Sequence, residues 1–106
     1  MSTATPFVII DICLIPHNVG TSLSPYVAAC QTIFQNANLN YQLHPFGTVV
    51  EGDWDTVFEA IKACHLKVHD LGAARISSTL KIGTRTDRTQ TMSDKIVSVQ
   101  ESLSSG

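Results

Sequence analysis

The chain has 106 residues, of which 43% are hydrophobic and 15% charged, with a formal net charge of −2. That length fits one domain, residues 1–106, and supplies enough apolar side chains for a modest core. The slightly acidic balance argues against a nucleic-acid or membrane partner, either of which calls for a basic field. The cysteines Cys13, Cys30 and Cys64 are odd in number and widely spaced. We therefore expect three buried free thiols, as in a cytoplasmic protein.

The first third of the chain predicts a strand followed by a helix. Residues Phe7–Ile15 are rich in β-branched side chains, and Pro16 should stop the strand that they form. Ser24 is expected to cap a helix, with Pro25 in the first turn where its missing N–H costs nothing. Apolar residues then recur at helical spacing as far as Ala37.

The middle of the chain predicts a hairpin and a second helix. The run "YQLHPFGTVVEG" (41–52) contains two short extended segments around Phe46 and Gly47. Asp53 is a suitable cap for the helix that follows. An apolar stripe runs along that helix, and Gly72 is placed to end it.

The last third predicts a fourth strand and a C-terminal helix. Residues Ala74–Gly83 alternate apolar and polar side chains, as in a strand with one covered face. A final helix should begin near Thr91, with Asp94 three residues later as a variant of the capping box. The order β-α-β-β-α-β predicts an α+β, ferredoxin-like fold with a four-stranded antiparallel sheet, two helices on one face and an extra C-terminal helix.

The first strand is too apolar for its second face to lie open to water. One set of alternate residues should face the helices, and the other set is also largely apolar: Phe7, Ile9, Asp11, Cys13 and Ile15. We therefore expect another subunit's sheet or the C-terminal helix to cover this face. An apolar second face of this kind predicts a homo-oligomer.

Two carboxylates are candidates for ligand binding. Asp11 lies in the middle of the first strand, where a covered carboxylate needs a partner. It either contacts Lys81 or a threonine of the fourth strand, or recognises a ligand in an interface pocket. Glu51 closes the third strand just before a helix begins, where free backbone N–H groups gather. It is either such a ligand contact or a solvated strand end.

The stretch "KIGTRTDRTQT" (81–91) is the candidate for an anion site. Arg85 and Arg88 flank Asp87, and the guanidinium fork suits phosphate or carboxylate. The same composition describes a solvated loop with an internal Arg–Asp pair, so both alternatives stay open.

Other motifs give little support to catalysis or metal binding. His65 and His69 have the spacing of two metal ligands, but they lack the glutamate of a zinc-protease motif and a third ligand. Trp54 is more typical of a core or interface anchor than of a stacking platform. No nucleophile motif or phosphate-binding glycine loop is present in the sequence, so we expect no enzyme activity, no metal and no cofactor.

Several runs together resemble the small thiamine-binding-protein family. The most specific are P-x-G-T-x-x-E-G, which here places Pro45, Gly47, Thr48, Glu51 and Gly52, and R-x-D-x-x-x-x-M-x-x-K. The second run places Arg85, Asp87, Met92 and Lys95. The resemblance covers nearly the whole chain.

The resemblance implies a homotetramer, a dimer of dimers that pair their sheets, with a pocket at a subunit interface. The implied ligand is thiamine or its hydroxymethylpyrimidine portion. Asp11, Thr48 and Glu51 are the expected polar contacts, and Arg85 would hold a phosphate. The alternatives are an oligomeric regulatory or scaffold domain without a small ligand, and an enzyme acting on a phosphorylated small molecule.

Overall fold

A computed structural model describes residues 5–88 and 90–105. The strands are β1 (Phe7–His17), β2 (Asn40–His44), β3 (Gly47–Asp53) and β4 (Arg75–Thr84), and the helices are α1 (Ser24–Asn36), α2 (Trp54–Asp70) and α3 (Met92–Ser105). All neighbouring strands are antiparallel, in the order β2-β3-β1-β4. The predicted ferredoxin-like α+β fold with an extra C-terminal helix is confirmed.

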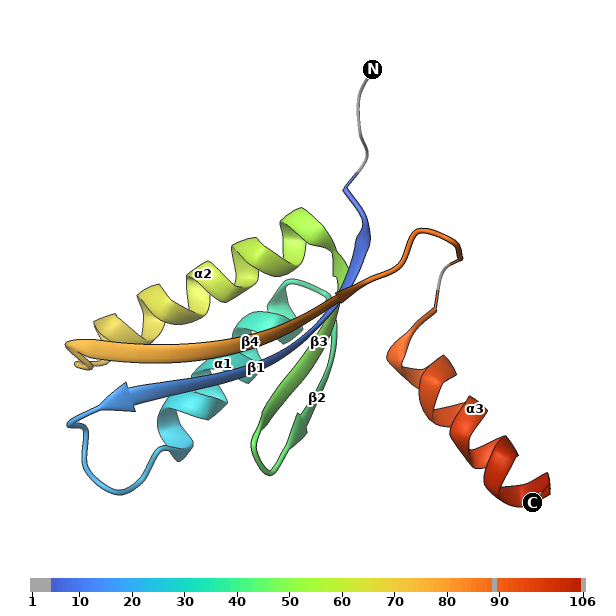
Figure 1. The fold of residues 1–106 in the computed structure, drawn as a ribbon. Coiled ribbons are helices and arrows are strands. Elements are labelled where there is room, and N and C mark those ends of the chain that lie inside the picture. Colours follow the sequence, from blue (N-terminus) through green and yellow to red (C-terminus); the bar gives the residue numbers. More distant parts are fainter. Residues whose placement is uncertain (1–4, 89, 106) are drawn as a thin grey trace.

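The molecule has a sheet layer and a helix layer, with the third helix apart from both. Helices α1 and α2 lie together on one face of the sheet, and α3 projects away from this body (Figure 1). The core lies between the sheet and the two packed helices. Its largest fully buried side chains come from both layers: Phe34, Ile10, Val8, Val50, Val57, Val68 and Cys64.

Strand β1 runs two residues beyond the predicted end. It continues through Pro16 to His17, where Pro16 lies opposite Ile76 of β4. The pairing of β1 with β3 stops at Ile12. Pro16 therefore lies in a two-stranded extension, where one edge of β1 needs no N–H donor, and a proline is tolerated there.

The start of α1 also differs from the prediction. The helix already includes Ser24, its N-cap is Leu23, and no side chain caps it. The carbonyl oxygen of Leu23 accepts hydrogen bonds from the N–H groups of Tyr26 and Val27, each at 3.1 Å. Since Pro25 has no N–H, the first turn has one donor fewer to satisfy, and a side-chain cap is less needed.

The predicted ends of α2 are confirmed. The Asp53 carboxylate caps the helix by accepting a hydrogen bond from the Thr56 N–H. Hydrogen bonds from Thr5 and then Thr56 lower the pKa of Asp53 below its usual value. Gly72 follows the helix with a φ of 111°, the left-handed conformation that favours glycine at this position.

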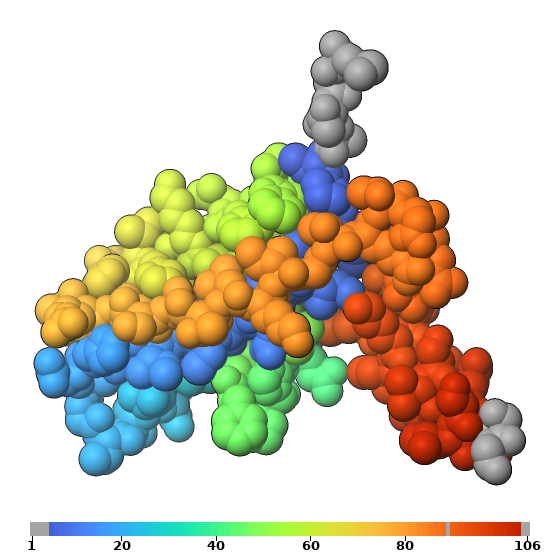
Figure 2. Space-filling model, viewed as in Figure 1, coloured from blue at the N-terminus to red at the C-terminus, as the bar shows by residue number. Residues whose placement is uncertain are grey.

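Helix α3 begins with the predicted reciprocal cap. Thr91 Oγ1 accepts from the Asp94 N–H at 3.1 Å, and the Asp94 carboxylate accepts from the Thr91 N–H at 3.0 Å. The apolar side chains of this helix remain exposed, including Ile96, Val99 and Leu103. Figure 2 shows α3 projecting from the body of the molecule. None of the helices among the described residues has both the length and the apolar character needed to cross a bilayer.

The second face of β1 is left largely uncovered by the chain itself. Ile9 and Cys13 are half-buried and Ile15 is exposed. Cys13 therefore departs from the prediction of three buried thiols, whereas Cys30 and Cys64 are buried and all three are free. Among the described residues only the start of α3 and the loop before it lie near this face, where Met92 donates to Glu51, so the rest of the predicted cover has to come from outside the described chain.

Candidate ligand-binding site

A cavity of about 370 Å³ opens between α1 and the helix-facing side of the sheet. Its walls come from β1, α1 and the β2–β3 hairpin, with Cys64 of α2 at the far side, and its lining is mainly apolar. Cavities of this size and character are typical of small-molecule sites, where a few polar groups fix the orientation of the ligand.

The polar centre of this cavity is a pair formed by α1 and β3. Gln31 Nε2 donates a hydrogen bond to Thr48 Oγ1 at 2.8 Å, and Thr48 is only 5% exposed. Thr48 reaches the helix side because it lies opposite Ile12, one of the helix-facing residues of β1. The predicted candidate Thr48 therefore lines the cavity.

Gln31 has an unsatisfied hydrogen-bonding group at this site. Its Oε1 atom is buried and has no hydrogen-bond partner among the described residues. An unpaired buried polar atom costs about 1–3 kcal/mol, so proteins rarely retain one without a reason. Rotating the amide by 180° would present an N–H group instead, so one polar end stays free in either orientation. The site can therefore offer an acceptor or a donor to a ligand.

The predicted candidate Asp11 is not among the residues that line the cavity, but it contacts the hairpin that does. Its Oδ1 atom lies 2.7 Å from His44 Nε2. Because the Phe46 N–H donates to His44 Nδ1, the proton of the neutral ring is on Nε2, and Nε2 donates to Asp11. The alternative of a partner on β4 is wrong, because this histidine is the hydrogen-bond partner that the structure gives Asp11, although Lys81 lies directly opposite Asp11 in the sheet. Asp11 thus fixes a turn whose residues, His44 and Phe46, line the cavity.

Gly47 allows the hairpin to pack closely against β1. A Cβ atom at this position would lie 2.5 Å from the carbonyl oxygen of Ile12. Since that neighbour is backbone, a side chain at position 47 would force the strands apart and reshape the cavity wall.

Two thiols meet where α1 and α2 line the cavity. The Cys64 thiol donates toward the Cys30 carbonyl oxygen at 4.0 Å, and both residues are buried. The interaction with Cys64 lowers the pKa of the Cys30 thiol, whereas the same interaction, together with burial, raises the pKa of Cys64.

The predicted candidate Glu51 lies on the opposite face of the sheet from Thr48. It is opposite Ile9 of β1, is 4% exposed, and accepts a hydrogen bond from Asn40 Nδ2 at 2.6 Å. Its second oxygen accepts from the Met92 N–H at the start of α3 at 2.8 Å. Glu51 is therefore not a solvated strand end; its carboxylate holds the N-terminus of α3, where a negative charge is favoured.

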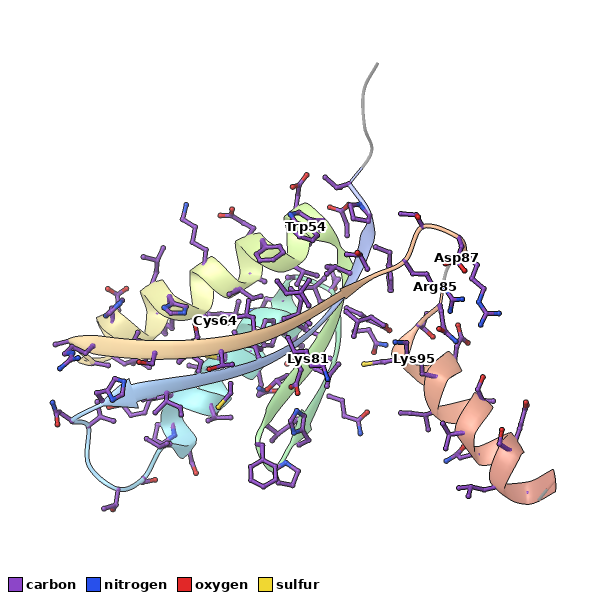
Figure 3. The ribbon with its side chains drawn as sticks, viewed as in Figure 1. Trp54, Cys64, Lys81, Arg85, Asp87 and Lys95 are labelled. Atoms are coloured by element: carbon purple, nitrogen blue, oxygen red, sulfur yellow. The ribbon has the colours of Figure 1, made fainter. Side chains whose placement is uncertain are left out.

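The predicted candidate Arg85 lies in the loop before α3. Its guanidinium donates two hydrogen bonds to the Asp87 carboxylate and one to Gln90 Oε1. Figure 3 shows Arg85 and Asp87 together in this loop, with Lys95 on the following helix. Asp87 raises the pKa of Arg85, and Arg85 lowers the pKa of Asp87. The predicted internal Arg–Asp pair is present, and Arg85 does not line the cavity beneath α1.

The histidine pair on α2 has separate structural partners. His65 Nε2 lies 2.8 Å from Ser78 Oγ, and His69 Nδ1 lies 2.7 Å from the Ala73 carbonyl oxygen. Across the described ranges 5–88 and 90–105, no three His, Cys, Asp or Glu side chains are arranged to hold a metal ion. Trp54 packs against Phe58 with ring centroids 4.6 Å apart, beside the core.

Gln31 was missed as a site residue, although the sequence contains a signal for it. Residues 27, 30, 31 and 34 share one face of α1, and the other three are Val27, Cys30 and Phe34. A glutamine in an otherwise apolar stripe is a buried polar group that requires a partner.

The structure is a ferredoxin-like domain with a mainly apolar cavity between its first helix and its sheet. A model of the family described as thiamine-binding protein matches residues 10–100. The chain belongs to the thiamine-binding protein family. The resemblance stated from the sequence motifs is therefore confirmed.

Curated relatives come from several branches of life. A UPF0045 protein of Synechocystis is 55% identical over 93 residues, covering 88% of this chain and 77% of the relative. The UPF0045 protein ECM15 of Eremothecium gossypii is 38% identical and covers 91% of this chain and 92% of its own length.

Two solved structures share the fold. The protein MJ1052 of Methanocaldococcus jannaschii has a TM-score of 0.83 and 32% identity, covering 91% of this chain and 98% of that one. A Thermotoga maritima protein, named for a proposed role in thiamine biosynthesis or salvage, has a TM-score of 0.75 over 89% of this chain and 99% of its own. At 19% identity the second likeness shows the fold alone. The family's name supports a small-molecule binding role for this chain.

Proposed function

We propose that the protein binds thiamine, or the hydroxymethylpyrimidine portion of thiamine, in the cavity between α1 and the sheet. The single observation that carries the proposal is the buried Oε1 of Gln31, which has no hydrogen-bond partner among the described residues and lies in a mainly apolar cavity. In the family named for thiamine binding, a group of this kind is best explained as one half of a hydrogen bond to a ligand.

An aminopyrimidine suits this cavity. Its exocyclic amine is a donor for Gln31 Oε1, and its ring nitrogens are acceptors if the amide is turned the other way. The flat ring would lie among aromatic and aliphatic walls supplied by Tyr26, Phe34 and Leu43. The exposed side chain of Phe46, at the hairpin end of the cavity, is positioned to cover a bound ring.

The polar groups of this cavity suit a protein that binds its ligand without catalysing a reaction. The cavity is lined by the Gln31 amide, the hydroxyl-bearing Thr48 and Tyr26, three cysteines and the His44 ring, whose two nitrogens are engaged by Asp11 and the Phe46 N–H. We propose a cytosolic carrier, buffer or sensor, in keeping with the three free cysteines.

Calorimetric titration of the purified protein with thiamine and with hydroxymethylpyrimidine tests this function. We expect both compounds to bind, because both carry the aminopyrimidine edge that Gln31 would read. Neutral indole, which is flat and apolar but lacks that edge, is the control and should bind far more weakly. Absence of heat and of a thermal shift with both pyrimidines would overturn the proposal.

We also propose that the protein forms a homo-oligomer, a dimer of dimers, with Asp11 and the uncovered face of β1 near a subunit contact. The exposed apolar side chains of α3 and of β1 support this proposal, because such surface is usually covered in a stable protein. Sedimentation equilibrium should give about four times the chain mass of 11.5 kDa. A single species of 11.5 kDa would contradict the oligomer and leave the ligand proposal intact.

A scaffold role without a small ligand is the second candidate. The same exposed stripe of α3, including Val97 and Leu103, favours it because the stripe is a surface for another chain. An oligomer that binds neither thiamine nor hydroxymethylpyrimidine would support this alternative.

A further inference from the structure

A second cavity, of about 300 Å³, lies on the other face of the sheet from the α1 cavity. Its apolar floor is Phe7 and Ile9 of β1, and Ile9 lies opposite Glu51 rather than among the helix-facing residues. Gly83 and Thr84 close one side from β4, and the loop before α3 and the helix itself supply the rest of the wall.

Positive charge is concentrated around this cavity. Three of the chain's seven lysines and arginines line it, namely Arg85, Arg88 and Lys95, although the whole chain has a net charge of −2. No aspartate or glutamate is among its lining residues in the described part of the chain. A cavity with this lining favours an anion, because its basic side chains create a positive electrostatic field and the nearby acids lie outside its wall.

The nearby acids are held by other groups. The Asp87 carboxylate accepts two hydrogen bonds from Arg85, and the Asp94 carboxylate accepts from the Thr91 N–H. Within the described ranges neither Arg88 nor Lys95 forms an ion pair. Lys95 is therefore available to a bound anion, and so is the Arg88 guanidinium, although its charge also contributes to lowering the pKa of Asp94.

Arg85 is held in a fixed orientation beside them. Three of its five N–H donors are used by Asp87 and Gln90, which leaves two for a ligand. Because Asp87 balances its charge, Arg85 contributes directed hydrogen bonds, whereas Arg88 and Lys95 contribute the net positive charge.

We propose that this cavity binds a phosphate monoester of a small aromatic or heterocyclic compound. The phosphate lies against Arg88, Lys95 and the free donors of Arg85, and the ring lies on Phe7 and Ile9. The site is separate from the α1 cavity, with which it shares no lining residue. The inference is independent of the proposed thiamine function.

Calorimetry with phenyl phosphate as the probe tests this site. We expect wild-type protein to bind phenyl phosphate more tightly than inorganic phosphate, and phenol hardly at all, because both the charge and the apolar floor contribute. The Arg88→Gln/Lys95→Gln double variant should bind phenyl phosphate about five- to tenfold more weakly. The matched control, Lys62→Gln/Lys67→Gln, removes the same charge from exposed positions on α2 and should stay within about twofold of wild type.

Two outcomes would overturn the proposal. The first is that wild-type protein does not bind phenyl phosphate. The second is that the control variant loses as much affinity as the double variant, which would indicate a general charge effect. In the first case, a change in the sedimentation behaviour of the double variant would assign the cavity to a contact between copies of the chain. Phenyl phosphate binding that is unchanged in Gln31→Leu protein would show that the two cavities act separately.

Discussion

The Gln31→Leu/Thr48→Val variant is expected to bind thiamine at least about tenfold more weakly than wild type, while its unfolding temperature stays the same or rises. Both replacements are close to the original residues in size. They remove a hydrogen-bonded pair together with the buried oxygen of Gln31 that has no partner in the described structure. Replacing a partly satisfied polar group by an apolar one is close to neutral for stability, whereas the ligand loses its hydrogen bond.

A loss of thiamine affinity without a loss of stability distinguishes a binding residue from a structural one. Gln35→Leu is the matched control, since Gln35 lies one turn further along α1 and is exposed. It should change neither quantity appreciably. Isothermal titration and thermal unfolding of the three proteins provide the measurements. A double variant that binds thiamine as tightly as wild type would remove Gln31 and Thr48 from the site.

Glu51→Ala is expected to lower the free energy of unfolding by about 2–3 kcal/mol, the largest stability effect of any single substitution discussed. The substitution leaves the Asn40 amide and the Met92 N–H without the acceptor that they share. It also removes a carboxylate from the N-terminus of α3, where the helix dipole favours negative charge. For a chain of this length the loss corresponds to a fall of roughly 10 °C or more in Tm.

Hydrogen exchange shows whether the effect comes from α3. The Met92 amide and the first turn of α3 should lose protection in Glu51→Ala, whereas the amides of the core strands should change only with global stability. Glu59→Ala, at an exposed position on α2, is the control and should leave both Tm and exchange unchanged. Equal behaviour of the two variants would show that Glu51 does not hold α3.

The ends of α2 and the start of α3, which local chemistry sets, were predictable from the sequence, whereas the Ser24 cap predicted for α1 was wrong. Asp53 and Gly72 bound α2, and the Thr91–Asp94 pair begins α3, because capping groups act on backbone atoms a few residues away. The predicted end of β1 was wrong because the length of the strand depends on which strands lie beside Pro16. The arrangement of neighbouring strands is set by the whole sheet and cannot be predicted from the residues of β1 alone.

The candidate site was predicted only in part, for a related reason. Thr48 and Glu51 stand in one motif, yet strand alternation sends them to opposite faces, where one meets Gln31 and the other meets α3. A contact with β4 was one of the two alternatives for Asp11, but the hairpin brings His44 to it from 33 residues away. Long-range partners of this kind depend on how the hairpin packs, which a pattern of residue types does not specify.

Intermolecular nuclear Overhauser effects from bound thiamine locate its site, because they report which face of the sheet the ligand contacts. The α1 cavity predicts contacts from the pyrimidine methyl and ring protons to the methyl groups of Val27 and Leu43. Contacts instead to Ile9 and Val49, on the face of the sheet away from α1 and α2, would contradict the account.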